Sequence, residues 1–185
     1  MKKLLLLIPI VAMTLFAGGE KVSKYMSQVF NEGRGFDIQV SSVMYKHTQT
    51  HRYTPLIVQV HNWTEPDLRV SVNAFTLVDD KGNTFSPISS EDFLENHRVQ
   101  GRRNYKYLSR RGDNGIETKP SIWYIERTNF YPSSFAGGRG GAVRSVSVKA
   151  NFYCIDWLYF DSLPPGNYTL QFDAGGETLS MPVFL

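Results

Sequence analysis

The chain of 185 residues has little of two things that often reveal function: cysteine and catalytic motifs. It contains one cysteine, Cys154, so no disulfide can form within the chain and a small disulfide-stapled fold is excluded. Cys154 lies in an apolar run, where a free thiol behaves as a small core hydrophobe. An intermolecular disulfide is the alternative. The GxSxG, HExxH and SxxK signatures of common hydrolases are absent.

The remaining polar residues give no catalytic or metal constellation, so we expect neither an enzyme nor a cofactor. Three histidines, His47, His51 and His61, are weak candidate ligands for zinc or copper. On an extended strand the first two would lie on one face about 13 Å apart, too far to share an ion. Adjacent carboxylates at residues 79–80 and 91–92 occur where turns and helix caps explain them.

Long hydrophobic runs are absent after the N-terminus, where residues 4–16 form an apolar run of about 13 residues. Lys2 and Lys3 precede this run and small residues follow it, a pattern that predicts a secretory signal peptide over residues 1–19. An uncleaved N-terminal anchor is the alternative. Charges or glycines interrupt every later apolar run, so the sequence predicts no transmembrane segment after cleavage. We therefore expect an exported protein, periplasmic or extracellular at the cell surface.

A strong charge of one sign is also lacking. Removing the signal takes away two of the 20 Lys and Arg residues, which leaves 18 against 17 Asp and Glu. This near-neutral balance argues against nucleic acid as a partner. The remaining length, roughly 165 residues, suits one domain.

Apolar residues recur with a period of two through most of the chain. Leu56, Val58 and Val60 alternate with polar or outward positions, and residues 36–40 and 70–74 behave in the same way. The parity then shifts, which predicts a β-bulge near Ala74, and Gly82 is expected to take the positive-φ position of a hairpin loop. Short strands separated by turn residues predict an all-β fold of the sandwich class over residues 35–185.

Helical patterns are few. Apolar residues at helical spacing and a glycine stop at Gly33 predict a short N-terminal helix over residues 20–34, with a partly helical linker as the alternative. Ser89 or Ser90 is the expected N-cap of a second short helix, because acidic residues fill its first turn.

Residues 54–87 and 157–172 resemble telokin-like immunoglobulin-fold domains of bacterial envelope proteins. The residues that match the family pattern are packing and turn residues: Asn62, Leu77, Asp79 or Asp80, Gly82, Phe85 and Pro87. The resemblance implies an immunoglobulin-like β-sandwich in the envelope that serves as an adhesion, scaffold or ligand-holding module. It implies no chemistry. Residues 88–142 depart from the pattern as a long irregular insertion.

The insertion contains the most unusual composition, because no acidic residue occurs from Asn96 to Gly112. Basic and aromatic residues alternate there, and together they form the predicted ligand- or partner-binding set: Arg98, Arg102, Arg103, Tyr105, Lys106, Tyr107, Arg110 and Arg111. Such a loop can bind an acidic protein surface, an acidic glycan or anionic headgroups. A solvated loop without a ligand is the alternative.

Two functions follow from these patterns. The leading hypothesis is a non-catalytic β-sandwich that binds protein, as a subunit or accessory of a cell-envelope or surface assembly, with self-association included. The apolar C-terminal stretch, residues 180–185, and the N-terminal stretch are places where β-augmentation between subunits is expected. The alternative is a carbohydrate- or polyanion-binding module that uses the basic-aromatic loop.

Overall fold

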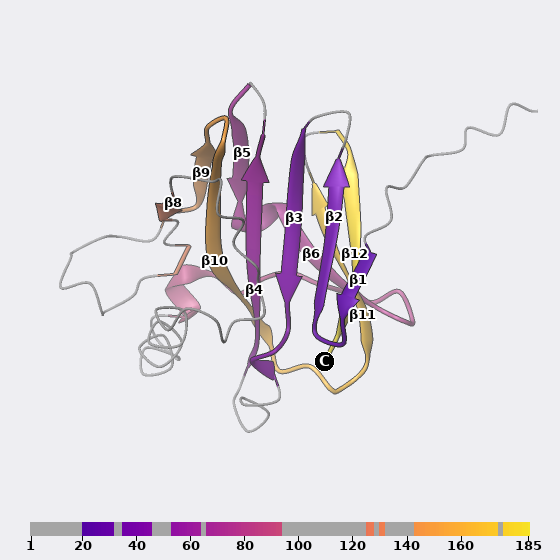
Figure 1. Cartoon of the computed structure of the whole chain (residues 1–185). Coiled ribbons are helices and arrows are strands. Elements are labelled where there is room, and N and C mark those ends of the chain that lie inside the picture. Colours follow the sequence, from indigo (N-terminus) through magenta and orange to yellow (C-terminus); the bar gives the residue numbers. More distant parts are fainter. Residues whose placement is uncertain are drawn as a thin grey trace, which may run out of the picture.

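The computed structural model describes residues 20–31, 35–45, 53–63, 66–93, 125–127, 130–131, 143–173 and 176–185. This part of the chain is built from antiparallel β-sheets with almost no helix, as predicted (Figure 1). A helix long and apolar enough to cross a membrane does not occur among the described residues. The predicted signal peptide, residues 1–19, lies outside them.

The larger sheet has six strands, and its long central strands are β4 and β10. In spatial order the strands are β1 (Glu20–Ser23), β2 (Met26–Asn31), β3 (Phe36–Ser41), β4 (Tyr53–Asn62), β10 (Phe152–Asp161) and β8 (Ile125–Arg127). All neighbours are antiparallel except β8, which runs parallel to β10. The parallel pair requires a long crossover in the chain, and part of the insertion provides it.

A four-stranded sheet and a two-stranded ribbon complete the fold. The four-stranded sheet has the order β12 (Thr178–Phe184), β11 (Asn167–Asp173), β6 (Phe75–Asp79) and β7 (Thr84–Phe85). The ribbon pairs β5 (Leu68–Ser71) with β9 (Ser145–Val148). The four-stranded sheet lies behind β2 and β3 in Figure 1, so the two larger sheets form two layers.

The core lies between these two layers. Phe36 of β3 meets Phe172 of β11 edge-on with ring centroids 6.3 Å apart, and Phe75 of β6 lies 4.8 Å from the same Phe172 ring. Leu56, Val58 and Val60 are fully buried, as their period-two pattern predicted. Cys154 is buried in the same cluster, which agrees with its interpretation as a core residue.

The predicted N-terminal helix over residues 20–34 is wrong, because the described residues 20–31 form β1 and β2. Strand β2 pairs with β3 along its whole length, from Met26 opposite Ser41 to Asn31 opposite Phe36. An isolated helix of about 14 residues is marginal in water, so a strand ladder with a sheet that is already formed outweighs helical spacing. Apolar spacing alone therefore did not determine this element.

The expected β-bulge near Ala74 is also wrong. A 3₁₀ helix, η1 (Val72–Ala74), changes the parity, and the Ser71 side chain caps it by accepting a hydrogen bond from the Asn73 N–H. The chain turns there because β5 belongs to the ribbon and β6 to the four-stranded sheet.

Two smaller predictions are confirmed. Gly82 has a φ of +84°, which places it in the left-handed region at the β6–β7 turn. The Ser89 hydroxyl accepts a hydrogen bond of 3.0 Å from the Asp92 N–H, so it caps the helical turn at residues 90–93.

Candidate functional site

The outer face of the six-stranded sheet, which points away from the four-stranded sheet, carries a buried polar row. Asp37 and Gln39 of β3 lie directly opposite His61 and Gln59 of β4. These four side chains are the polar row; they are 7%, 5%, 1% and 0% exposed, in the order Asp37, Gln39, His61 and Gln59. Burial of polar groups is costly unless they are hydrogen-bonded, so their partners determine what the row can do.

Asp37 and His61 form the centre of the row. His61 Nδ1 lies 2.7 Å from Asp37 Oδ1, and the Trp63 indole N–H donates to Asp37 Oδ2 over 2.7 Å. The Tyr153 ring packs edge-on against the imidazole with centroids 5.2 Å apart. The carboxylate therefore receives two hydrogen bonds in a site screened from water, where such bonds are strong.

Gln59 occupies the other ring nitrogen of His61. Its Nε2 lies 3.0 Å from His61 Nε2. The Gln59 and Gln39 side-chain oxygens are buried, and neither accepts a hydrogen bond in the described structure. The row therefore combines a tightly held acid–imidazole pair with two unsatisfied acceptors on neighbouring strands.

His61 is also one of the weak candidate metal ligands. In the described structure its Nδ1 contacts Asp37 and its Nε2 contacts Gln59. His47 and His51, the other weak candidates, lie outside the described residues. Within those residues, no group of three potential metal-ligating side chains occurs.

An aromatic cluster covers the other end of the same face. Its members are Tyr53, Phe93, Tyr131, Trp157 and Tyr159. The Phe93 ring stacks on Tyr159 with centroids 4.4 Å apart. Burial raises the pKa of Tyr131 well above its usual value, because a phenolate would lose its hydration there. The cluster is therefore a dry layer above the sheet.

The described ends of the insertion are fastened to β10 through this cluster. Before the undescribed stretch, the Ile88 N–H donates to the Tyr159 carbonyl over 2.8 Å. After it, the Phe130 N–H donates to Asp156 Oδ2 over 2.8 Å, and the Tyr131 hydroxyl donates to the Ile88 carbonyl over 3.0 Å. Strand β8 adds a parallel ladder with residues 153–155. The described segments on either side of residues 94–124 are thus held on one strand.

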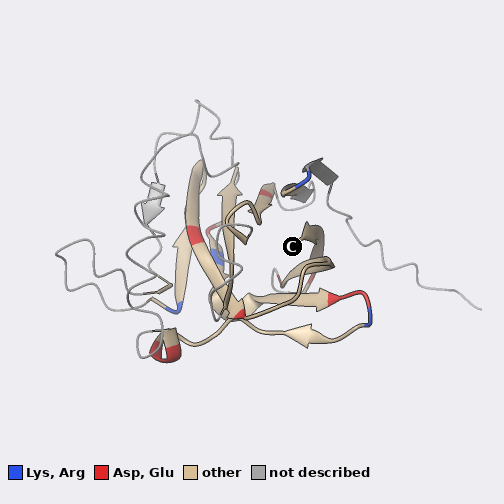
Figure 2. Ribbon diagram, turned by 90° about the horizontal axis from the view of Figure 1, so that it is seen from below, with Lys and Arg blue, Asp and Glu red and all other residues tan. Residues whose placement is uncertain are grey.

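The predicted binding residues themselves lie outside the described residues. These are Arg98, Arg102, Arg103, Tyr105, Lys106, Tyr107, Arg110 and Arg111. On the described ribbon, blue Lys and Arg segments are few and separated from one another (Figure 2). The described part therefore contributes no second basic cluster to compare with the predicted one.

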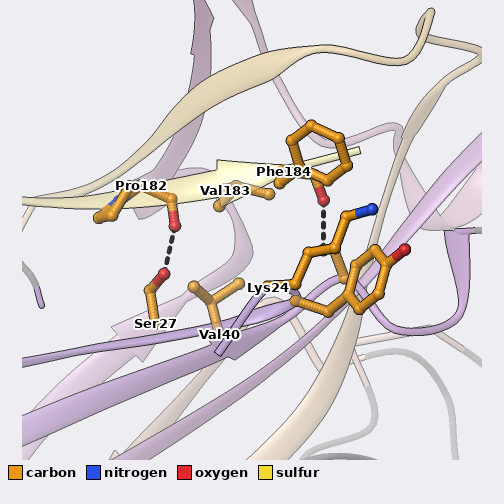
Figure 3. A pocket seen from close by; sticks show the side chains of 8 residues that line it. Lys24, Ser27, Val40, Pro182, Val183 and Phe184 are labelled. Carbon is orange, nitrogen blue, oxygen red and sulfur yellow. Dashed lines mark hydrogen bonds between the residues drawn. The ribbon is translucent and has the colours of Figure 1, made fainter. Parts of the chain in front are cut away.

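A small pocket lies where the edges of the two sheets meet (Figure 3). Its volume of about 20 Å³ is room for one or two water molecules. Lys24 lines it, with its ammonium 4.9 Å from the centre of the Phe184 ring. The Ser27 hydroxyl donates to the Pro182 carbonyl, and the Ser42 hydroxyl donates to the Phe184 carbonyl. The residues around the pocket thus join the two sheets, and we call this junction the seam.

This seam bears on the expected β-augmentation at the C-terminal strand. The apolar side chains Leu179, Met181 and Val183 of β12 are buried in the core. Along the outer edge of β12, the two serines occupy carbonyl groups and Pro182 has no N–H to donate. Proline and occupied edge groups discourage strand addition. The apolar sequence of this strand is therefore explained by the core.

Sequence reasoning missed the polar row, apart from naming His61 as a metal candidate. A signal was present, because polar residues alternate with large apolar ones in residues 36–41 and 56–61. Such alternation predicts one face on a core and one face toward water or a second layer, without choosing between the last two. Trp63, together with Tyr153 of β10, contacts the row on this side of the sheet.

Searches for similar proteins place the chain in no established group. No protein-family model matches it, and no curated protein matches it. Among solved structures, the crystal structure of the yjhA protein from Bacillus subtilis is similar, with 14% identity and a TM-score of 0.36. The match covers 86% of this chain and 79% of that chain. A likeness at this score carries no argument about fold or function.

Proposed function

We propose that this protein is an exported, non-catalytic binding subunit or accessory of a cell-envelope or surface assembly. Its scaffold is an immunoglobulin-like β-sandwich, and its recognition element is the basic-aromatic loop within residues 88–142. The partner is a protein with an acidic surface. Arg102, Arg103 and Lys106 supply charge, and Tyr105 and Tyr107 supply contact area.

The anchoring of the insertion is the observation that supports this proposal. Ile88, Phe93 and Phe130 are held on β10 by hydrogen bonds or ring stacking, and β8 is paired with it. Binding residues in proteins are concentrated on loops that a rigid scaffold positions. A loop fixed at both ends also loses less conformational freedom on binding than a free tail does.

The seam at β12 supports a loop-centred mode over strand addition. The outer edge of β12 has its Pro182 and Phe184 carbonyls occupied, and β1 on the neighbouring edge is short and irregular. These are features by which natural sheets avoid pairing with other chains. Recognition through the loop leaves the edges of β12 and β1 unchanged.

The test is a pull-down from the envelope fraction of the source cells at low and high salt. The double variant Arg102→Glu/Arg103→Glu is compared with Lys81→Glu/Lys149→Glu, which changes the net charge equally at two exposed positions. We expect a stoichiometric protein partner with the wild type and the control, and at least a tenfold loss with the arginine variant. Each reversed contact costs on the order of 1 kcal/mol or more at an interface.

Two outcomes contradict this proposal in different ways. A protein partner that the arginine variant retains would show that recognition lies elsewhere on the molecule. Recovery of acidic glycan alone, lost at high salt, would favour the polyanion-binding alternative, because screening weakens contacts between exposed charges.

A further inference from the structure

The contacts of the polar row suit one arrangement of protons on His61. With Asp37 ionised, its Oδ1 accepts a hydrogen bond from a protonated His61 Nδ1 over 2.7 Å. The amide nitrogen of Gln59 is a donor, so His61 Nε2, 3.0 Å away, has a free lone pair and accepts. The arrangement therefore holds a neutral imidazole beside a buried carboxylate.

Two features leave this arrangement incomplete. The Asp37 charge is buried against neutral donors alone, the imidazole and the Trp63 indole. In addition, the side-chain oxygens of Gln39 and Gln59 are buried without a donor in the described structure. Unsatisfied buried acceptors in a folded protein are uncommon and require an explanation.

We propose that the polar row is a proton switch, in which uptake of a second proton by His61 is coupled to reversal of the Gln59 amide. The proton comes from solvent and binds His61 Nε2, where the Gln59 N–H group would oppose it. A half-turn of the amide presents Gln59 Oε1 to the new N–H instead. Both amide orientations occupy the same volume, so the surrounding side chains need not move.

The same reversal provides a donor for Gln39. Gln39 and Gln59 are direct partners in the β3–β4 ladder. Side chains in that relation share one face, with Cβ atoms about 4.5–5.5 Å apart. The reversed amide directs its N–H group away from His61 toward the Gln39 oxygen. Before the proton binds, a charged carboxylate lies beside a neutral imidazole, and two amide oxygens lack a donor. One proton converts the carboxylate and imidazole into an ion pair and provides donors for both oxygens.

Two titratable side chains are in contact with His61. Asp37 is hydrogen-bonded to its ring, and the Tyr153 ring packs against it. Beyond Tyr153, β8 places Glu126 and Arg127 in register with residues 154–155 of β10. His61, Tyr153 and Ile125 lie at one level across β4, β10 and β8, so the row adjoins the strand on which the insertion returns. This inference does not depend on the proposed function.

Nuclear magnetic resonance of the ¹⁵N-labelled exported protein tests the switch during acidification. We expect the His61 ring to change from one to two protonated nitrogens. The Gln59 side-chain amide signals should shift with the same midpoint, while those of the exposed Gln28 stay constant. The proposal is overturned if His61 stays neutral until the protein unfolds, or if the Gln59 signals do not follow it.

The variant Gln39→Leu provides a second, independent test. Without the Gln39 oxygen, the reversed amide lacks its acceptor, so the second proton binds less tightly. The midpoint of the His61 titration should fall by roughly one pH unit. An unchanged midpoint in the folded variant contradicts the role of Gln39. If the variant does not fold, the wild-type titration alone decides.

Discussion

The two faces of the β3–β4 pair are equally buried but are built from opposite kinds of side chain. On the inner face, Phe36, Ile38 and Val60 are at most 1% exposed and meet the four-stranded sheet. On the outer face, Asp37 and His61 are 7% and 1% exposed and meet each other. Burial alone therefore does not distinguish the faces; the chemistry of what is buried does.

The two faces also contribute differently to the fold. Apolar burial is non-directional and stabilises in proportion to area, whereas each bond of the polar row requires particular atoms. Because side chains alternate along a strand, a one-residue slip of β3 would place Asp37 in the core and Ile38 opposite the polar residues. The inner face thus supplies most of the stability, and the outer face penalises the wrong register.

The largest effect is expected from Phe172→Ala on the inner side. Phe172 is fully buried; its ring contacts Phe36 of the opposite layer and Phe75 of its own sheet. Its removal should lower the free energy of unfolding by about 3–5 kcal/mol, because it leaves a cavity between the sheets. Denaturation in urea measures this, and Phe172→Leu should cost less than about half as much. Equal losses in both variants would mean that volume is not the cause.

On the outer face, the expected effect is smaller and depends on the partner. Asp37→Ala leaves the Trp63 and His61 donors without their acceptor, which should cost about 2–3 kcal/mol. Adding His61→Ala should cost much less than the sum of the single changes. A coupling of at least about 1 kcal/mol in the double-mutant cycle is the diagnostic quantity. Strict additivity would show that the two side chains do not act as a pair.

The sequence predicted the all-β class and several strands, because alternation in residues 36–41 and 53–62 is strong and local. It mispredicted residues 20–31, where helical spacing was outweighed by pairing with β3. It indicated a β-type run over residues 121–130, which contains β8, but it did not indicate that β8 pairs in parallel with β10, a strand that begins 27 residues after β8 starts. The local sequence of a strand does not identify a pairing partner that is distant in the chain.

The site was less predictable than the fold, for a related reason. The polar residues of β3 and β4 are visible in the sequence, but whether a strand face is wet depends on what covers it. At the other end of that face, Phe93 and Tyr131, which flank residues 94–124, both pack on Tyr159. Local pattern cannot reveal a cover that comes from another part of the chain. The binding residues predicted in the insertion remain a prediction.

The smallest effect on stability at neutral pH is expected for Tyr131→Phe in the aromatic cluster. The variant loses the hydrogen bond from the Tyr131 hydroxyl to the Ile88 carbonyl, worth about 1 kcal/mol. Its pH dependence carries more information. Burial raises the pKa of Tyr131 in the folded state, so above about pH 10 the folded protein holds a proton that the unfolded chain releases. Wild-type stability should therefore fall as the pH rises through that region.

Replacing this hydroxyl removes its contribution to the loss of stability at alkaline pH. The difference in unfolding free energy between Tyr131→Phe and wild type should shrink from pH 7 to roughly pH 11. Urea denaturation at each pH measures this difference. Tyr168→Phe is a suitable comparison, because burial also raises the pKa of Tyr168, which lies in the four-stranded sheet. A difference that stays constant with pH would mean that Tyr131 ionises as freely as in the unfolded chain. The aromatic cluster would then not exclude water from Tyr131.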